Sequence, residues 1–385
     1  MRKDPAGPAT PGPSGRSLAV NDLTVIKTRE PVRLLWCDLA RVVAATLVVL
    51  IHVSAKWFEN YGRIPAFDWQ VANILDSAAR LSVPWFFMLS GFLLFERKPA
   101  TFAGYMRRRM IRVLGPFLLF SAIGVLFAST MGPKPASWNV LLDPPYYHLW
   151  FFQPLLVLYL IAYFVTPVKA NPWLGVGICY ALIAVTGGSL ANLEVSGLAV
   201  HSEQTFAYVL YGLAGHYVAR VPLRRWTGQA SLGVLMVAVA ALAFATSSLS
   251  GATGFGNEAL YSYVSLPVAT AAIAGFVWVR SLGLRLGCRV SPTTESAVTW
   301  LSGYSLAVYG LHAFILAAVW NLAGERLLKL GALAGIPLLM AGIGALSLMA
   351  AMAAGAIDRK GLLLGTPNRR ACGCDTGRRS ARRPS

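Results

Sequence analysis

Apolar blocks close to 20 residues long recur along most of this 385-residue chain. A helix needs about 20 residues to cross a hydrocarbon core of roughly 30 Å. Backbone polar groups cannot stay unpaired in lipid, so such blocks must be helices. The composition agrees, because 56% of the residues are hydrophobic and only 13% are charged, against about 25% charged in globular proteins. The chain is therefore predicted to be an all-α polytopic membrane protein.

The apolar pattern predicts about ten transmembrane helices, separated by breaks rich in Pro and Gly. The expected spans are 34–55, 81–96, 110–130, 149–167, 173–191, 205–219, 230–249, 260–281, 299–323 and 333–356. Residues 1–30 are rich in Pro, Gly and polar side chains and lack the apolar core of a signal peptide. They are predicted to be a disordered cytoplasmic tail, followed by a transmembrane domain over 31–358 and a basic cytoplasmic tail over 359–385.

The net charge of +18 does not indicate nucleic-acid binding, because Lys and Arg fall in short segments between the apolar blocks. In a membrane protein, this distribution marks cytoplasmic loops. With ten spans and the N-terminus inside, most of the 34 basic residues are cytoplasmic. The outer connections hold only Lys56, Arg63, Arg80, Lys134, Arg326 and Lys329. Both termini are therefore predicted to be cytoplasmic.

The first predicted span contains Arg41 and His52, separated by ten residues of which only Thr46 is polar. An ionisable residue inside a span costs several kcal/mol and is a functional candidate by default. Eleven helical steps of about 100° return to within roughly 20° of the starting direction, so both side chains share one face, roughly 16 Å apart. This arrangement suits a long anionic donor, with Arg41 gripping a phosphate or carbonyl and His52 as general base.

A structural alternative remains for these two residues. Asp38 and Arg41 could form a buried pair for packing, and His52 could hydrogen-bond to a neighbouring helix. A sensor or a proton-coupled transporter could also use them.

Further candidates lie on other predicted spans. Arg109 and Arg112 belong to a basic cluster over 97–112, which is either a phosphate cradle or a topological and lipid-headgroup signal. His312 lies in the middle of its span and is a second candidate for the reaction centre. His148 and Trp150 open the fourth span and would either form an interfacial belt or bind a sugar. Ser90 with Gly91 could supply a nucleophile, although helix packing is favoured.

Several stretches resemble the membrane-bound acyltransferase-3 family. Arg41 followed after ten residues by His52 on a first transmembrane helix is similar to the hallmark of that family. The similar stretches, in order, are FFMLSG at 86–91, the Arg-rich run at 108–112 before Pro116, HLWFF at 148–152 and YGLH at 309–312. The resemblance covers about residues 34–357. Within the family, residues 71–80 and 206–212 resemble the enterobacterial common antigen O-acetyltransferases.

The resemblance implies transfer of an acetyl group from cytoplasmic acetyl-CoA to a hydroxyl of a lipid-linked or cell-envelope glycan. It assigns cofactor binding to Arg41, Arg109 and Arg112 and catalysis to His52. It also implies a bacterial inner-membrane location, with the lipid bilayer, acetyl-CoA and the glycan as partners. No metal is expected, since the five cysteines form no zinc framework. Nucleic acid is not expected as a partner, because the basic residues are spread over short segments between the apolar blocks. The alternative is a transporter or flippase of glycan intermediates, although no inverted repeat is evident.

Overall fold

The computed structural model describes residues 34–96, 101–131, 146–189, 202–287, 289–358 and 361–365, and every element in these ranges is helical. The predicted tail over 1–30 lies outside them, as does most of the predicted C-terminal tail. The α-helices are α1 (Leu35–Phe58), α2 (Ala66–Ala79), α3 (Ser82–Phe95), α4 (Phe102–Met131), α5 (Phe152–Phe164), α6 (Pro172–Ser189), α7 (Ser202–Val218), α8 (Thr227–Thr253), α9 (Leu266–Leu286), α10 (Pro292–Lys329) and α11 (Ala332–Ile357). Two short 3₁₀ helices are η3 (Tyr147–Phe151) and η4 (Ala259–Tyr261).

The ten predicted spans all fall on helices, which confirms the all-α polytopic architecture. Among the described residues, eight helical segments are long and apolar enough to cross a membrane. The two remaining predicted spans coincide with α6 and α7, which are shorter. Their crossing stays a prediction, as does the side of the membrane on which the termini lie.

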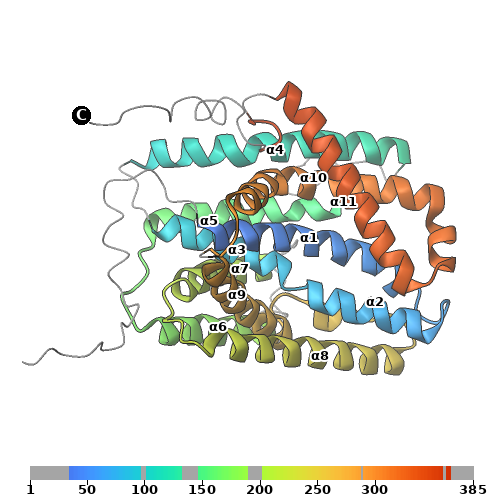
Figure 1. Ribbon diagram of the computed structural model, residues 1–385, viewed down its shortest axis with the longest axis horizontal. Coiled ribbons are helices and arrows are strands. Elements are labelled where there is room, and N and C mark those ends of the chain that lie inside the picture. Colours follow the sequence, from blue (N-terminus) through green and yellow to red (C-terminus); the bar gives the residue numbers. More distant parts are fainter. Residues whose placement is uncertain are drawn as a thin grey trace, which may run out of the picture. The chain divides into compact units, whose positions relative to one another are not determined.

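Helix α1 lies within the bundle that the described helices form and packs against α2, α3, α9, α10 and α11 (Figure 1). Small side chains allow this close approach, since Ala40 and Ala44 are fully buried. Its contact with α10 is parallel, because Ser302 bonds to Asp38 and, further along both helices, His312 lies against His52. Parallel neighbours require an odd number of crossings between them, and the predicted spans between α1 and α10 are odd in number.

The FFMLSG stretch lies on α3 and forms a close contact with α7. A Cβ atom added to Gly91 would lie 2.0 Å from the carbonyl oxygen of Gly212, and one added to Gly215 would lie 2.0 Å from that of Met88. Glycine is thus required on both helices for their backbones to meet. This contact supports the packing interpretation of the Ser90–Gly91 pair.

One prediction about the outer connections is wrong. Arg80 was expected between spans, but α2 and α3 together form a single apolar segment, Ala66–Phe95, with Arg80 inside it. Arg80 can lie inside this segment because it forms an ion pair with Asp76, one turn earlier on α2. A paired guanidinium can enter a bundle that would exclude an isolated charge.

The Gly91 contact predicts a stability defect. Gly91→Ala should lower the stability of the detergent-purified protein by about 1–3 kcal/mol, because the methyl group forces α3 and α7 apart. Gly342→Ala is the matched control, since nothing lies within 4 Å of its added Cβ. Thermal unfolding measures both variants, and equal melting temperatures would contradict the close α3–α7 contact.

Candidate active site

Arg41 is held at one end of α1 by a network that joins this helix to α10. Its Nη1 atom donates to Asp38 Oδ1 at 3.2 Å and to Ser302 Oγ at 3.4 Å. Ser302 Oγ in turn donates to Asp38 Oδ1 at 2.7 Å, and Thr299 Oγ1 donates to Asp38 Oδ2 at 3.3 Å. The ion pair between Asp38 and Arg41 that the structural alternative predicted is therefore present. The Arg41 side chain nevertheless stays 32% exposed, so N–H donors remain for a ligand.

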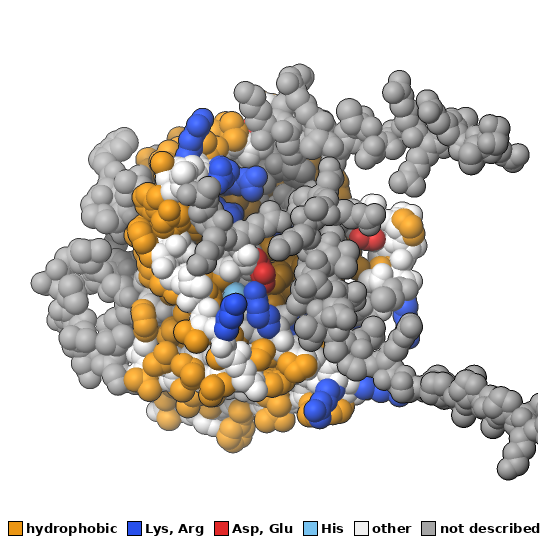
Figure 2. Space-filling view, turned by 90° about the vertical axis from the view of Figure 1, so that its left-hand side faces the viewer, with side chains coloured by type: hydrophobic (Ala, Val, Ile, Leu, Met, Phe, Trp, Pro, Cys, Tyr) orange, Lys and Arg blue, Asp and Glu red, His pale blue; other side chains and the backbone are white. Residues whose placement is uncertain are grey.

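Arg109 and Arg112 lie on α4 near the same end of α1. The Arg109 guanidinium stands over the rings of Tyr105 and Tyr159, at 5.6 and 5.7 Å from their centroids. Arg41, Arg109 and Arg112 all lie within electrostatic range of the Tyr159 hydroxyl. The structure thus brings the three predicted donor-binding residues to one end of the bundle. Figure 2 shows this end, where Lys and Arg side chains gather on the described surface.

Three histidines from distant parts of the chain meet further along α1. His52 on α1 has its ring centroid 5.2 Å from that of His312 on α10, and His312 lies 5.5 Å from His148 on η3. Tyr147, the residue before His148, stands edge-on to His52 at 5.0 Å. His148 and His312 are buried, whereas His52 is partly exposed. Of the three imidazoles, His52 is therefore the least buried.

Backbone carbonyls of α10 define the tautomers of the two buried histidines. His312 Nδ1 lies 2.6 Å from the Tyr309 carbonyl oxygen, and His148 Nε2 lies 3.2 Å from that of Gly310. A carbonyl only accepts, so each of these nitrogens carries the proton and the opposite nitrogen is left with a lone pair. Those opposite atoms, His312 Nε2 and His148 Nδ1, are buried and have no hydrogen-bond partner among the described residues. Both can accept a proton.

His148 and Trp150 do not lie together on an open face. His148 is buried and belongs with His52 and His312 to one cluster, the histidine group. The hydroxyl of Tyr309 donates to the carbonyl oxygen of His148 at 2.5 Å. Trp150 is partly exposed and stands beside the rings of Tyr208 and Tyr263, at 5.3 and 6.1 Å. Its indole therefore belongs to an aromatic wall inside the bundle.

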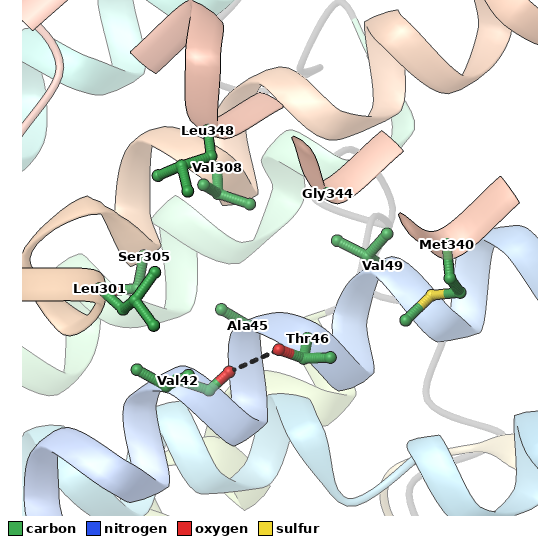
Figure 3. Close-up of a pocket in the computed structure, with 10 residues that line it drawn as sticks. All are labelled: Val42, Ala45, Thr46, Val49, Leu301, Ser305, Val308, Met340, Gly344 and Leu348. Atoms are coloured by element: carbon green, nitrogen blue, oxygen red, sulfur yellow. Dashed lines mark hydrogen bonds between the residues drawn. The ribbon is translucent and has the colours of Figure 1, made fainter. Parts of the chain in front are cut away.

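An apolar pocket of about 150 Å³ flanks α1 between Arg41 and His52. Figure 3 shows its lining from α1, α10 and α11, which consists of Val42, Ala45, Thr46, Val49, Leu301, Ser305, Val308, Met340, Gly344 and Leu348. The two hydroxyls are already engaged, since Thr46 donates to Val42 O and Ser305 to Ser302 O. The pocket therefore offers contact for hydrocarbon and no charged group for phosphates.

Sequence reasoning missed the buried Asp76–Arg80 pair. Arg80 Nε donates to Asp76 Oδ1 at 2.8 Å, and the Arg80 guanidinium lies within electrostatic range of His52. The sequence signal for this pair was an acidic and a basic residue four positions apart inside an apolar stretch.

No group of three or more His, Cys, Asp or Glu side chains in the described part of the chain is arranged to hold a metal ion.

A family model described as an acyltransferase domain, Acyl_transf_3, matches residues 34–355. The chain belongs to this acyltransferase family and is a multi-pass membrane protein.

A stretch of 131 residues is 30% identical to an amino-acid racemase from Enterococcus faecalis, covering 31% of this chain and 18% of that protein. The chain thus spans less than a fifth of the length of this relative. No solved structure matches the present chain.

The hydrogen bonds of His312 predict that a substitution at this residue can lower activity without lowering stability. In His312→Asn, the side-chain amide can still donate to Tyr309 O while the second nitrogen is lost. We expect a fall in acyl-transfer kcat of about 100-fold, the lower end for loss of acid–base help, with a melting temperature close to the wild type. His312→Ala should lose both activity and stability. An Asn variant with wild-type kcat would exclude His312 from proton transfer.

Proposed function

We propose that the protein is an O-acetyltransferase of a bacterial inner membrane. It moves the acetyl group of cytoplasmic acetyl-CoA to a hydroxyl of a lipid-linked or cell-envelope glycan. The observation that carries this proposal is the stripe on α1 with Arg41 near Arg109 and Arg112 at one end and His52 beside two further histidines at the other. A transporter would not consume an acyl donor, and membership of an acyltransferase family favours the enzyme.

The donor is expected to bind along α1. Guanidinium groups recognise phosphate through paired N–H donors, and Arg41 keeps an exposed portion beyond its Asp38 bond. The phosphates of acetyl-CoA would bind at Arg41, Arg109 and Arg112, on the side that the charge distribution predicts to be cytoplasmic. An extended donor arm then spans the roughly 16 Å to His52, a distance set by the helix rise.

His52 acts as the general base in this proposal. It takes the proton of the acceptor hydroxyl while the hydroxyl oxygen attacks the thioester carbonyl, and it returns the proton to the departing thiolate of CoA. The bare Nε2 of His312 beside it can share the proton during the reaction. Direct transfer needs no acyl-enzyme intermediate.

The acceptor is proposed to be a saccharide. Trp150, Tyr208 and Tyr263 form an aromatic wall beside the histidine group, and aromatic faces stack on the apolar faces of sugar rings. The resemblance of residues 71–80 and 206–212 to enterobacterial common antigen O-acetyltransferases supports the same acceptor class.

Two substitutions test the donor site and the base separately. In purified protein supplied with acetyl-CoA and a glycan extract, His52→Ala should lower kcat by 100-fold or more while acetyl-CoA binding persists. Arg41→Ala should raise the KM for acetyl-CoA by about tenfold or more, because a charge-assisted hydrogen bond is lost. The readout is release of CoA together with mass-spectrometric detection of the acetylated glycan.

Arg225→Ala is the matched control for Arg41→Ala, since Arg225 is exposed and its recorded bond uses only its backbone carbonyl. Its KM should equal that of the wild type. A His52→Ala protein that acetylates at the normal rate would contradict the assignment of the base.

A further inference from the structure

Arg80 and Asp76 form an ion pair inside the apolar segment Ala66–Phe95. The side chain of Asp76 is fully buried and that of Arg80 is 11% exposed. Taking two charges out of water is costly, and their attraction offsets this only with good geometry and further hydrogen bonds. A pair kept at such a place in a membrane protein is a functional candidate.

The surroundings fix the guanidinium without using all of its donors. One face of Arg80 is covered by the ring of Tyr261, 4.2 Å from its centroid. Tyr261 is itself held, because its Oη donates to Asn73 Oδ1 at 2.7 Å. Arg80 Nε is engaged by Asp76 Oδ1, and the Tyr263 side chain forms a further hydrogen bond with Arg80.

The hydrogen bonding of the Asp76–Arg80 pair is also incomplete. Asp76 Oδ2 is buried and has no hydrogen-bond partner among the described residues. An arginine carries five N–H donors, and the two recorded side-chain bonds of Arg80 leave others for a ligand. A pair that served packing alone would be expected to form the bidentate contact that satisfies both oxygens.

Arg80 lies on the side of the bundle that carries the histidine group. Arg80 lies within electrostatic range of the His52 imidazole, and its partner Tyr263 stands 6.1 Å from the indole of Trp150. Lys56 is also within range of His52. Its ammonium, however, pairs with the exposed Glu59 carboxylate at 3.5 Å.

We propose that Arg80 is a further catalytic residue, whose N–H groups bind the thioester carbonyl oxygen as it becomes an oxyanion. This inference rests on the proposed acetyl transfer. Preorganised donors aimed at a developing charge are often the largest single contribution to acyl-transfer catalysis. Asp76 neutralises the guanidinium overall, so the pair favours the transient oxyanion without trapping a permanent anion from the solution.

The acceptor hydroxyl oxygen forms a bond to the carbonyl carbon of acetyl-CoA, and His52 takes the hydroxyl proton. The carbonyl π electrons move onto the oxygen, where Arg80 stabilises them. They return as the carbon–sulfur bond breaks, and the CoA thiolate receives the proton from His52.

The test compares Arg80→Gln with the double variant Asp76→Asn/Arg80→Gln in the purified full-length protein with acetyl-CoA and glycan extract. Arg80→Gln alone leaves the buried Asp76 charge without a partner and can unfold the protein. The double variant removes both charges together, so that no buried carboxylate is left without a partner, and it is expected to preserve the fold. We expect both variants to lose about 100- to 1000-fold in kcat, the range for loss of one oxyanion donor, with KM for acetyl-CoA within about threefold.

A structural role gives a different result. If the pair serves only the fold, the double variant regains a kcat within about threefold of the wild type, which overturns the proposal. A raised KM with unchanged kcat overturns it as well. Arg63→Gln is the matched control, because Arg63 is exposed, and its kcat should be unchanged. Absence of His52-dependent turnover in the wild type would instead overturn the proposed function.

Discussion

The parallel contact of α1 with α10 fixes both ends of the candidate site. At one end, Ser302 and Thr299 of α10 hold Asp38, which holds Arg41. At the other end, His312 of α10 lies against His52. Both functional side chains of α1 are thus oriented by one neighbouring helix, and a rotation of either helix would move the two together. The rigid rise of α1 keeps them roughly 16 Å apart.

The bilayer explains why so many polar side chains gather around this contact. Ionisable groups facing lipid are costly, and those inside a bundle are kept where they pair or function. Asp38, Asp76, His148 and His312 are all buried, and each bonds to another helix, to its own backbone or to a nearby cation. Three of the buried atoms without a hydrogen-bond partner in the described part of the chain lie near His52. His312 Nε2 and His148 Nδ1 belong to the histidine group, and Asp76 Oδ2 belongs to the ion pair whose Arg80 is within electrostatic range of His52.

The sequence predicted the fold well, because lipid allows few alternatives to long apolar helices. The ten predicted spans lie on helices, and the spacing of Arg41 and His52 predicted their common face. That His52 meets His148 and His312 does not follow from local periodicity, since this contact depends on how distant helices pack. Arg80 was misplaced because charge alone assigns a residue to a loop, and only its Asp76 partner brings it into the bundle. The tautomers of the buried histidines depend on carbonyls of α10, which no pattern in the sequence indicates.

The most direct test is an experimental structure of the protein with a non-hydrolysable acetyl-CoA analogue. The account predicts the phosphates beside Arg41, Arg109 and Arg112, with the acetyl group in contact with His52. An analogue bound elsewhere, or an acetyl group separated from His52 by a closed helix contact, would contradict it.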